Sequence, residues 1–133
     1  MKKKLLYLIL PIITLILEIL PYGAVCNFAN PEGEPWRRTF SYFDLTPFGY
    51  ANFAPFLTAI ATCVILISLL VYLTTNKYRA LTVAKTVACI GVILSLCPLF
   101  YGFTFFSFIG ALITVCLITE LLLLVFSSKT INN

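Results

Sequence analysis

Residues 50–75 read YANFAPFLTAIATCVILISLLVYLTT and contain no charged side chain. An α-helix rises about 1.5 Å per residue, so this stretch is long enough to cross a hydrocarbon core of about 30 Å. Asn52 is expected to cap the start of the helix, and Pro55 suits a first turn, where a backbone N–H has no partner within the helix. The stretch therefore predicts a transmembrane helix.

Three more apolar segments of similar length surround it, at residues 5–25, 80–101 and 105–126. Pro98 is expected to stop or bend the third span, and Gly102 begins a tight turn. Residues 5–25 follow a basic start, as a signal peptide would, and cleavage there would leave three spans. Because Glu18 interrupts the apolar run and Tyr22–Cys26 makes a poor cleavage site, an uncleaved anchor is favoured.

The composition agrees with a membrane protein. The chain has 133 residues, 61% of them hydrophobic and 11% charged, whereas soluble domains average about 45–50% apolar and about 25% charged residues. A soluble core cannot absorb so much apolar surface. The predicted fold is therefore all-α, a four-helix transmembrane bundle that forms a single membrane domain over residues 1–133.

The basic residues predict the orientation, because Lys and Arg in short loops resist translocation. Arg37 and Arg38 lie in the loop 26–49, and the other basic residues flank the opposite ends of the spans: Lys2, Lys3, Lys4, Lys77, Arg79, Lys85 and Lys129. Both termini are expected in the cytoplasm, and the membrane is expected to be a plasma membrane or a bacterial inner membrane.

The loop 26–49 is rich in aromatic residues. Trp36, Phe40 and Phe43 are spaced i, i+4, i+7, which predicts a short amphipathic helix lying on the outer leaflet. These rings are typical of an aromatic belt that anchors the bundle. With Arg37 and Arg38 they also form a candidate docking surface for a partner.

Two carboxylates fall within the predicted spans. Glu18 is a candidate proton-coupling group, or else a structural residue that bonds a tyrosine hydroxyl, Arg37 or Arg38. Glu120 matches Lys85 in depth, so these two residues form a candidate intramembrane ion pair that fixes the rotation of two helices.

Small residues recur at helical spacing in the last three spans, which predicts close packing between them. The stripes are Ala54, Thr58 and Thr62 in the second span, Ala80, Ala84, Ala88, Gly91 and Ser95 in the third, and Ser107, Gly110, Ala111 and Thr114 in the fourth. The first span has only Thr14 in its middle, so it is expected to be peripheral or available to another chain.

Nothing in the sequence predicts an enzyme, a cofactor or a metal site. The chain has no histidine, and its five cysteines include no C-x-x-C pair. A thiol oxidoreductase acting through Cys26 and Cys97 ranks third among the hypotheses.

Four short spans with a carboxylate, Glu18, in the first resemble the small multidrug resistance transporters, and this resemblance implies a dimeric proton-coupled exporter. The long loop 26–49 departs from that family's tight connections, and Glu18 is the only matched residue of its motif. The outline is also similar to claudin-like proteins, without their paired loop cysteines and Trp signature. Neither family is assigned.

The leading hypothesis is a non-enzymatic interaction or accessory subunit. Its partners are expected to be the lipid bilayer and either a protein or a second copy, bound through the outer loop and the small-residue helix faces. The alternative is a small proton- or ion-coupled transporter that uses Glu18.

Overall fold

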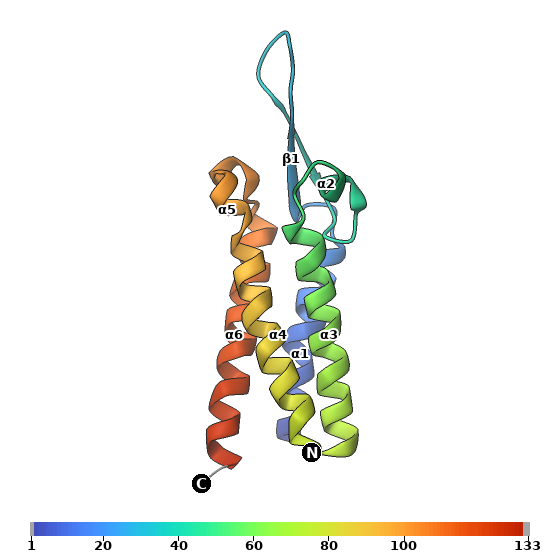
Figure 1. Ribbon diagram of the computed structural model, residues 1–133, viewed down its shortest axis with the longest axis vertical. Coiled ribbons are helices and arrows are strands. Elements are labelled where there is room, and N and C mark those ends of the chain that lie inside the picture. The colour runs from blue at the N-terminus through green and yellow to red at the C-terminus, as the bar shows by residue number, and fades with distance from the viewer. Residues whose placement is uncertain (1, 132–133) are drawn as a thin grey trace.

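The computed structural model describes the backbone of residues 2–131 and the side chains of residues 5–128. Four helices lie side by side: α1 (Lys2–Ile19), α3 (Ala54–Thr75), α4 (Tyr78–Leu96) and α6 (Phe108–Ile131) (Figure 1). Helices α1 and α4 each contact both α3 and α6, so the four helices form a closed ring.

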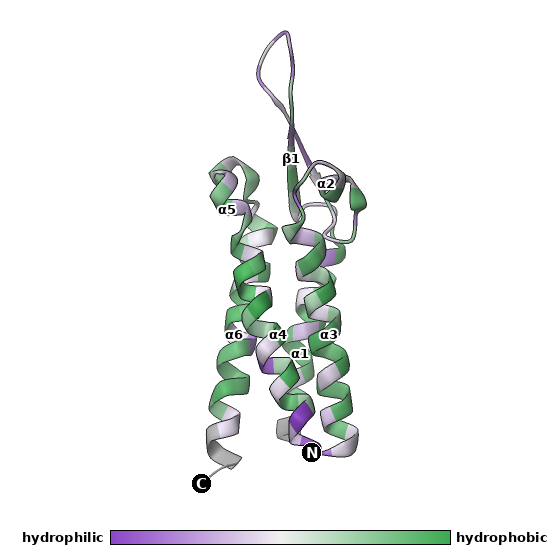
Figure 2. Cartoon of the chain, in the orientation of Figure 1, coloured by the Kyte–Doolittle hydropathy of each residue, from purple (hydrophilic) through white to green (hydrophobic). Residues whose placement is uncertain are grey.

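Three stretches within the described part of the chain are long and apolar enough to cross a membrane. They are Ala54–Thr75, Tyr78–Tyr101 and Phe108–Ser128. Helix α1 is apolar over the shorter stretch Leu5–Ile19. Apolar residues cover the middle of the bundle, and polar residues gather toward its ends and on the segment that projects from it (Figure 2). These features support a membrane protein.

The first helix is shorter than the sequence predicted. It ends at Ile19 rather than near residue 25, and Ala24–Phe28 forms strand β1. Pro21 gives the physical reason, because proline disfavours the helical conformation of the residue before it. Loop residues then close the helix end: Ser41 Oγ and Tyr42 N both donate to the carbonyl oxygen of Glu18, each at 2.9 Å.

The predicted amphipathic helix in the loop 26–49 is wrong, and so is the all-α class for this segment. Residues Trp36–Phe40 form strand β2, which pairs antiparallel with β1 from Phe28↔Trp36 to Ala24↔Phe40. The i, i+4 spacing of Trp36 and Phe40 also places both on one face of a strand, where side chains repeat every two residues. The β1–β2 hairpin projects beyond the helices (Figure 1).

A short helix, α2 (Leu45–Gly49), follows the hairpin. Asp44 caps it, because its Oδ1 accepts a hydrogen bond of 2.7 Å from Thr46 N. Hydrogen bonding to the Thr46 side chain, and then to this backbone N–H, lowers the pKa of the Asp44 carboxyl. The loop therefore contains helix, but it begins after Phe43 rather than at Trp36.

Helix α3 starts later than predicted, with Pro55 in its first turn as expected. Phe53, not Asn52, occupies the N-cap position, and Asn76 closes the helix in the left-handed conformation at φ 52°. Pro98 interrupts the third helical stretch as predicted, and it starts the short helix α5 (Pro98–Tyr101). Gly102, at φ 125°, then turns the chain into the 3₁₀ helix η1 (Phe103–Phe105).

The small-residue faces pack inside the bundle. Gly91 of α4 illustrates the fit, since a Cβ added there would lie 3.6 Å from Ala61 of α3 and 3.7 Å from Leu117 of α6. The buried small residues are Ala54, Thr58 and Thr62 of α3, Ala84, Ala88, Gly91 and Ser95 of α4, and Ser107, Gly110 and Thr114 around the start of α6. Neighbouring helices within the chain therefore occupy these faces.

Helix α1 begins, and α6 ends, at the end of the bundle opposite the hairpin (Figure 1). The connection between α3 and α4, with Lys77, and the start of α4, with Arg79, lie at this same end. The side chains of Lys2, Lys3, Lys4 and Lys129 lie outside the described residues. We call the opposite end, which carries the hairpin, α2, α5 and η1, the hairpin end.

Candidate functional site

Glu18 lies in the interior of the bundle, close to the C-terminal end of α1. Its side chain is fully buried, and Oε1 accepts a hydrogen bond of 2.7 Å from Thr62 Oγ1 of α3. Its second oxygen, Oε2, has no hydrogen-bond partner among the described residues. The expected bond to a tyrosine, Arg37 or Arg38 is therefore replaced by one to a threonine on a neighbouring helix.

Tyr42 covers this part of the bundle from the hairpin end. Its ring is 2% exposed, and it lies so close to Gly23 that a Cβ added there would be 2.8 Å from two ring carbons. The Tyr42 hydroxyl would lie 3.3 Å from a Cβ added at Gly110 of α6. Tyr42 thus fills the space between the loop that follows α1 and the start of α6.

Ser107 ties the same two segments together. Its hydroxyl donates to the carbonyl oxygen of Gly23 at 2.6 Å and accepts from Gly110 N at 2.8 Å. We call Gly23, Ser41, Tyr42, Ser107 and Gly110 the junction. It packs between Glu18 and the hairpin end, and Glu18 lines none of the three hollows described at that end. The hydrogen-bonded junction thus closes the bundle between Glu18 and the hairpin end, and we also call it the plug.

The predicted Lys85–Glu120 ion pair is not formed. Lys85 Nζ donates to the hydroxyl of Tyr78 at 3.3 Å and lies 5.2 Å from the centroid of that ring, on its own helix. Glu120 is 1% exposed, and both of its carboxylate oxygens lack a hydrogen-bond partner among the described residues. Lys85 is thus bonded along its own helix, whereas Glu120 is buried inside the bundle.

The predicted outer-loop residues divide between the two faces of the hairpin. Trp36, Arg38 and Phe40 alternate along β2 and so share one face of the strand. Arg37 lies on the other face, where its Nε donates to the carbonyl oxygen of Thr104 at 3.4 Å. Phe43 lies outside the strand, in the turn before α2. Trp36 is 62% exposed, and both arginines are exposed as well.

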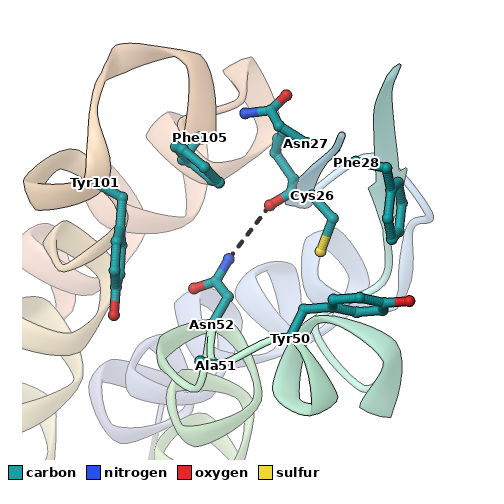
Figure 3. A pocket seen from close by; sticks show the side chains of 9 residues that line it. Cys26, Asn27, Phe28, Tyr50, Ala51, Asn52, Tyr101 and Phe105 are labelled. Atoms are coloured by element: carbon teal, nitrogen blue, oxygen red, sulfur yellow. Dashed lines mark hydrogen bonds between the residues drawn. The ribbon is translucent and has the colours of Figure 1, made fainter. Parts of the chain in front are cut away.

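A pocket of about 220 Å³ lies at the base of the hairpin (Figure 3). Strand β1, the connection before α3, and the α5–η1 segment all contribute to its walls. Asn52 reaches into this region, and its Nδ2 donates to the carbonyl oxygen of Val25 at 3.3 Å. The sequence had suggested Asn52 only as a helix cap, because nothing in the pattern indicated that β1 would return to this point.

The cysteines give no support to thiol redox chemistry. Cys26, Cys63, Cys89, Cys97 and Cys116 are all free. Burial, together with the nearby charge of Asp44, raises the pKa of the Cys26 thiol and so disfavours its reactive thiolate form. Among the residues that the structure describes, no group of His, Cys, Asp or Glu side chains is suited to hold a metal ion.

Comparison with known proteins found no matching family model, no matching curated protein and no matching solved structure.

Proposed function

We propose that this chain is a non-enzymatic accessory subunit that crosses the bilayer four times and presents its hairpin to a second membrane protein. Both termini are assigned to the cytoplasm and the hairpin to the outside. The single observation that carries this proposal is the paired, projecting hairpin, which the junction anchors on the bundle and which leaves Trp36 and Arg38 exposed.

The assignment of α1 as a fourth span rests on its packing and its flanks. It runs beside α3 and α6, and both of those helices include a stretch of membrane-spanning length. Its apolar stretch, Leu5–Ile19, falls short of a full span, but a short helix is accommodated by local bilayer thinning and by flanking residues that reach the headgroups. Lysines 2–4 supply such residues at its start.

The hairpin offers a partner an exposed strand. Strand β1 contacts η1 and α2, so other segments of this chain already pack against it. Strand β2 pairs with β1 and carries three consecutive exposed residues, Trp36, Arg37 and Arg38. An exposed strand edge is a template for another extended segment. Tryptophan and arginine are also the residues that contribute most to binding energy at interfaces.

The chemistry of β2 indicates the kind of partner. Arg38 has no hydrogen bond or ion pair with any described residue, and with Trp36 it borders a shallow hollow also lined by Phe28. Arg38 and Trp36 lie two positions apart on one strand face, so they match an extended partner segment. Its carboxylate would pair with Arg38, and an apolar side chain two residues away would contact Trp36. We therefore assign the partner as a membrane protein with such a segment in its outer part.

A photo-crosslinking amino acid at position 36 tests this proposal in native membranes. The expected result is one discrete adduct with a different protein, reduced at least five-fold by Arg38→Glu, which reverses the charge presented to the partner. The same crosslinker at position 103, where Phe103 is 89% exposed at the same end of the bundle, is the matched control. Adducts at position 36 that contain only lipid or a second copy of this chain would refute the proposal.

The second candidate function is proton- or ion-coupled transport through Glu18. The unpartnered Oε2 of Glu18 and the unpartnered carboxylate of Glu120 favour it, because α1 and α6 contact each other and carry both buried acids. The plug around Glu18 weighs against it, since a transported proton needs a path to water. Replacing Glu18 distinguishes these two functions.

A further inference from the structure

The pocket at the base of the hairpin contains a buried hydrogen-bond acceptor that the chain leaves unused. Asn52 is 7% exposed, and its Oδ1 has no hydrogen-bond partner among the described residues. Its Nδ2 is already committed to the carbonyl of Val25, which fixes the direction of the amide oxygen. In Figure 3 this oxygen points away from β1, towards the side where Tyr101 lies.

Two aromatic pairs flank the amide on opposite sides (Figure 3). On one side, Phe28 and Tyr50 meet edge to face with their ring centroids 5.0 Å apart. On the other side, Tyr101 and Phe105 lie 5.9 Å apart with a tilt of 53° between their rings. The space between the pairs is therefore walled largely by aromatic surface, and the unpartnered Asn52 Oδ1 lies between them.

The lining also defines the charge of a ligand. No Lys, Arg, Asp or Glu contributes to this pocket, so a charged ligand would lose its hydration without gaining an ion pair. A neutral molecule with a flat apolar body matches the aromatic walls. One N–H or O–H on that molecule would satisfy the Asn52 oxygen, whose desolvation otherwise costs free energy.

We propose that this pocket binds a small, neutral, largely aromatic ligand that donates one hydrogen bond to Asn52 Oδ1. A molecule of the size of indole suits the volume of about 220 Å³. The ligand lies between the base of the hairpin and the α5–η1 segment, so it contacts three separate parts of the chain. This proposal is independent of what binds to β2, on the hairpin itself.

Indole is the probe that tests the proposal, and N-methylindole is its matched control because it keeps the ring but lacks the donor. The full-length protein in lipid nanodiscs, with ¹⁵N-labelled asparagine, is titrated with each compound while the side-chain amide signal of Asn52 is followed by NMR. Indole is expected to cause a saturable shift of that signal. N-methylindole is expected to bind about ten-fold more weakly, because it leaves the buried oxygen unpaired.

Two alanine variants of α5 separate pocket binding from partition into the bilayer. Tyr101→Ala removes one wall and is expected to weaken indole binding at least five-fold. Phe100→Ala removes a neighbouring ring that is 89% exposed and does not line the pocket, so binding is expected to be unchanged. Equal affinity for indole and N-methylindole, or a shift that does not saturate and is indifferent to Tyr101→Ala, would overturn the proposal and leave water as the partner of Asn52.

Discussion

Replacement of Tyr42 with alanine is expected to lower the free energy of unfolding by about 3–5 kcal/mol, the usual cost of truncating a fully buried aromatic side chain. The ring is 2% exposed and packs against Gly23, and a Cβ at Gly110 would lie 3.3 Å from its hydroxyl. Its removal opens a cavity between the loop after α1 and α6. Because Tyr42 follows two residues after the end of β2, the hairpin is expected to loosen first.

Denaturant unfolding in detergent micelles measures this loss. Trp36 is the only tryptophan in the chain and lies on β2, so its fluorescence reports the hairpin directly. Tyr22→Ala is the matched control: that residue lies beside Gly23 in the loop after α1 but is 59% exposed, and its loss is expected to change stability by no more than about 0.5 kcal/mol. Tyr42→Phe keeps the ring and is expected to retain most of the stability. Equal stability of the Tyr42→Ala and Tyr22→Ala variants would show that the junction does not anchor the hairpin.

The second large effect concerns Glu18 and Thr62. Thr62→Val keeps the shape of the side chain but removes the hydroxyl that donates to Glu18 Oε1, so both carboxylate oxygens become unpaired inside the bundle. We expect this change to destabilise the protein by about 1–3 kcal/mol. Thr62→Ser keeps the hydroxyl and is the control, with a smaller expected loss.

The double variant Glu18→Leu/Thr62→Val replaces both partners with apolar groups. It is expected to be more stable than Thr62→Val alone and close to the parent, because neither position then holds a buried polar group without a partner. A double-mutant cycle in the same unfolding assay measures this coupling. Additive losses from the two substitutions would contradict a direct interaction.

Replacement of Glu18 also tests whether its role is structural or lies in proton transport. In vesicles with an imposed pH gradient, an accessory subunit is expected to carry no proton flux above that of protein-free vesicles, with or without Glu18→Gln. Flux in the parent that Glu18→Gln abolishes would establish the transport function instead.

The long apolar helices were predictable because length and hydrophobicity suffice to recognise them. The end of α1 was harder to place, since residues 20–25 are as apolar as a helix interior and only Pro21 indicates the break. Strand β1 contains Ala24 and Val25, which suit a buried strand as well as a membrane helix. Composition alone does not separate these two structures.

The hairpin was missed because the spacing of Trp36 and Phe40 is compatible with both secondary structures. Positions four apart share a face in a helix and also in a strand. The better signal was the turn-forming run from Asn30 to Pro35, with β-prone residues on both sides of it.

The Lys85–Glu120 pair was wrong for a different reason. Depth in the membrane follows from sequence position, but the direction of a side chain depends on how each helix is rotated. Glu120 shares the buried face of α6 with Leu117 and Leu124, whereas Lys85 reaches back to Tyr78 along α4. The packing of small residues against neighbouring helices fixes those rotations. The rotations therefore cannot be read from the pattern of a single sequence.

The most direct test of the account is whether α1 crosses the membrane and leaves the hairpin outside. One variant carries Gly33→Cys in the exposed hairpin turn and another carries a cysteine in a tag ahead of Met1, and the parent corrects for its native thiols. An impermeant maleimide is expected to label position 33 in intact cells and the tag only after permeabilisation. Labelling of both positions in intact cells, or of neither, would show that α1 does not cross, and labelling of the tag alone would place the hairpin in the cytoplasm.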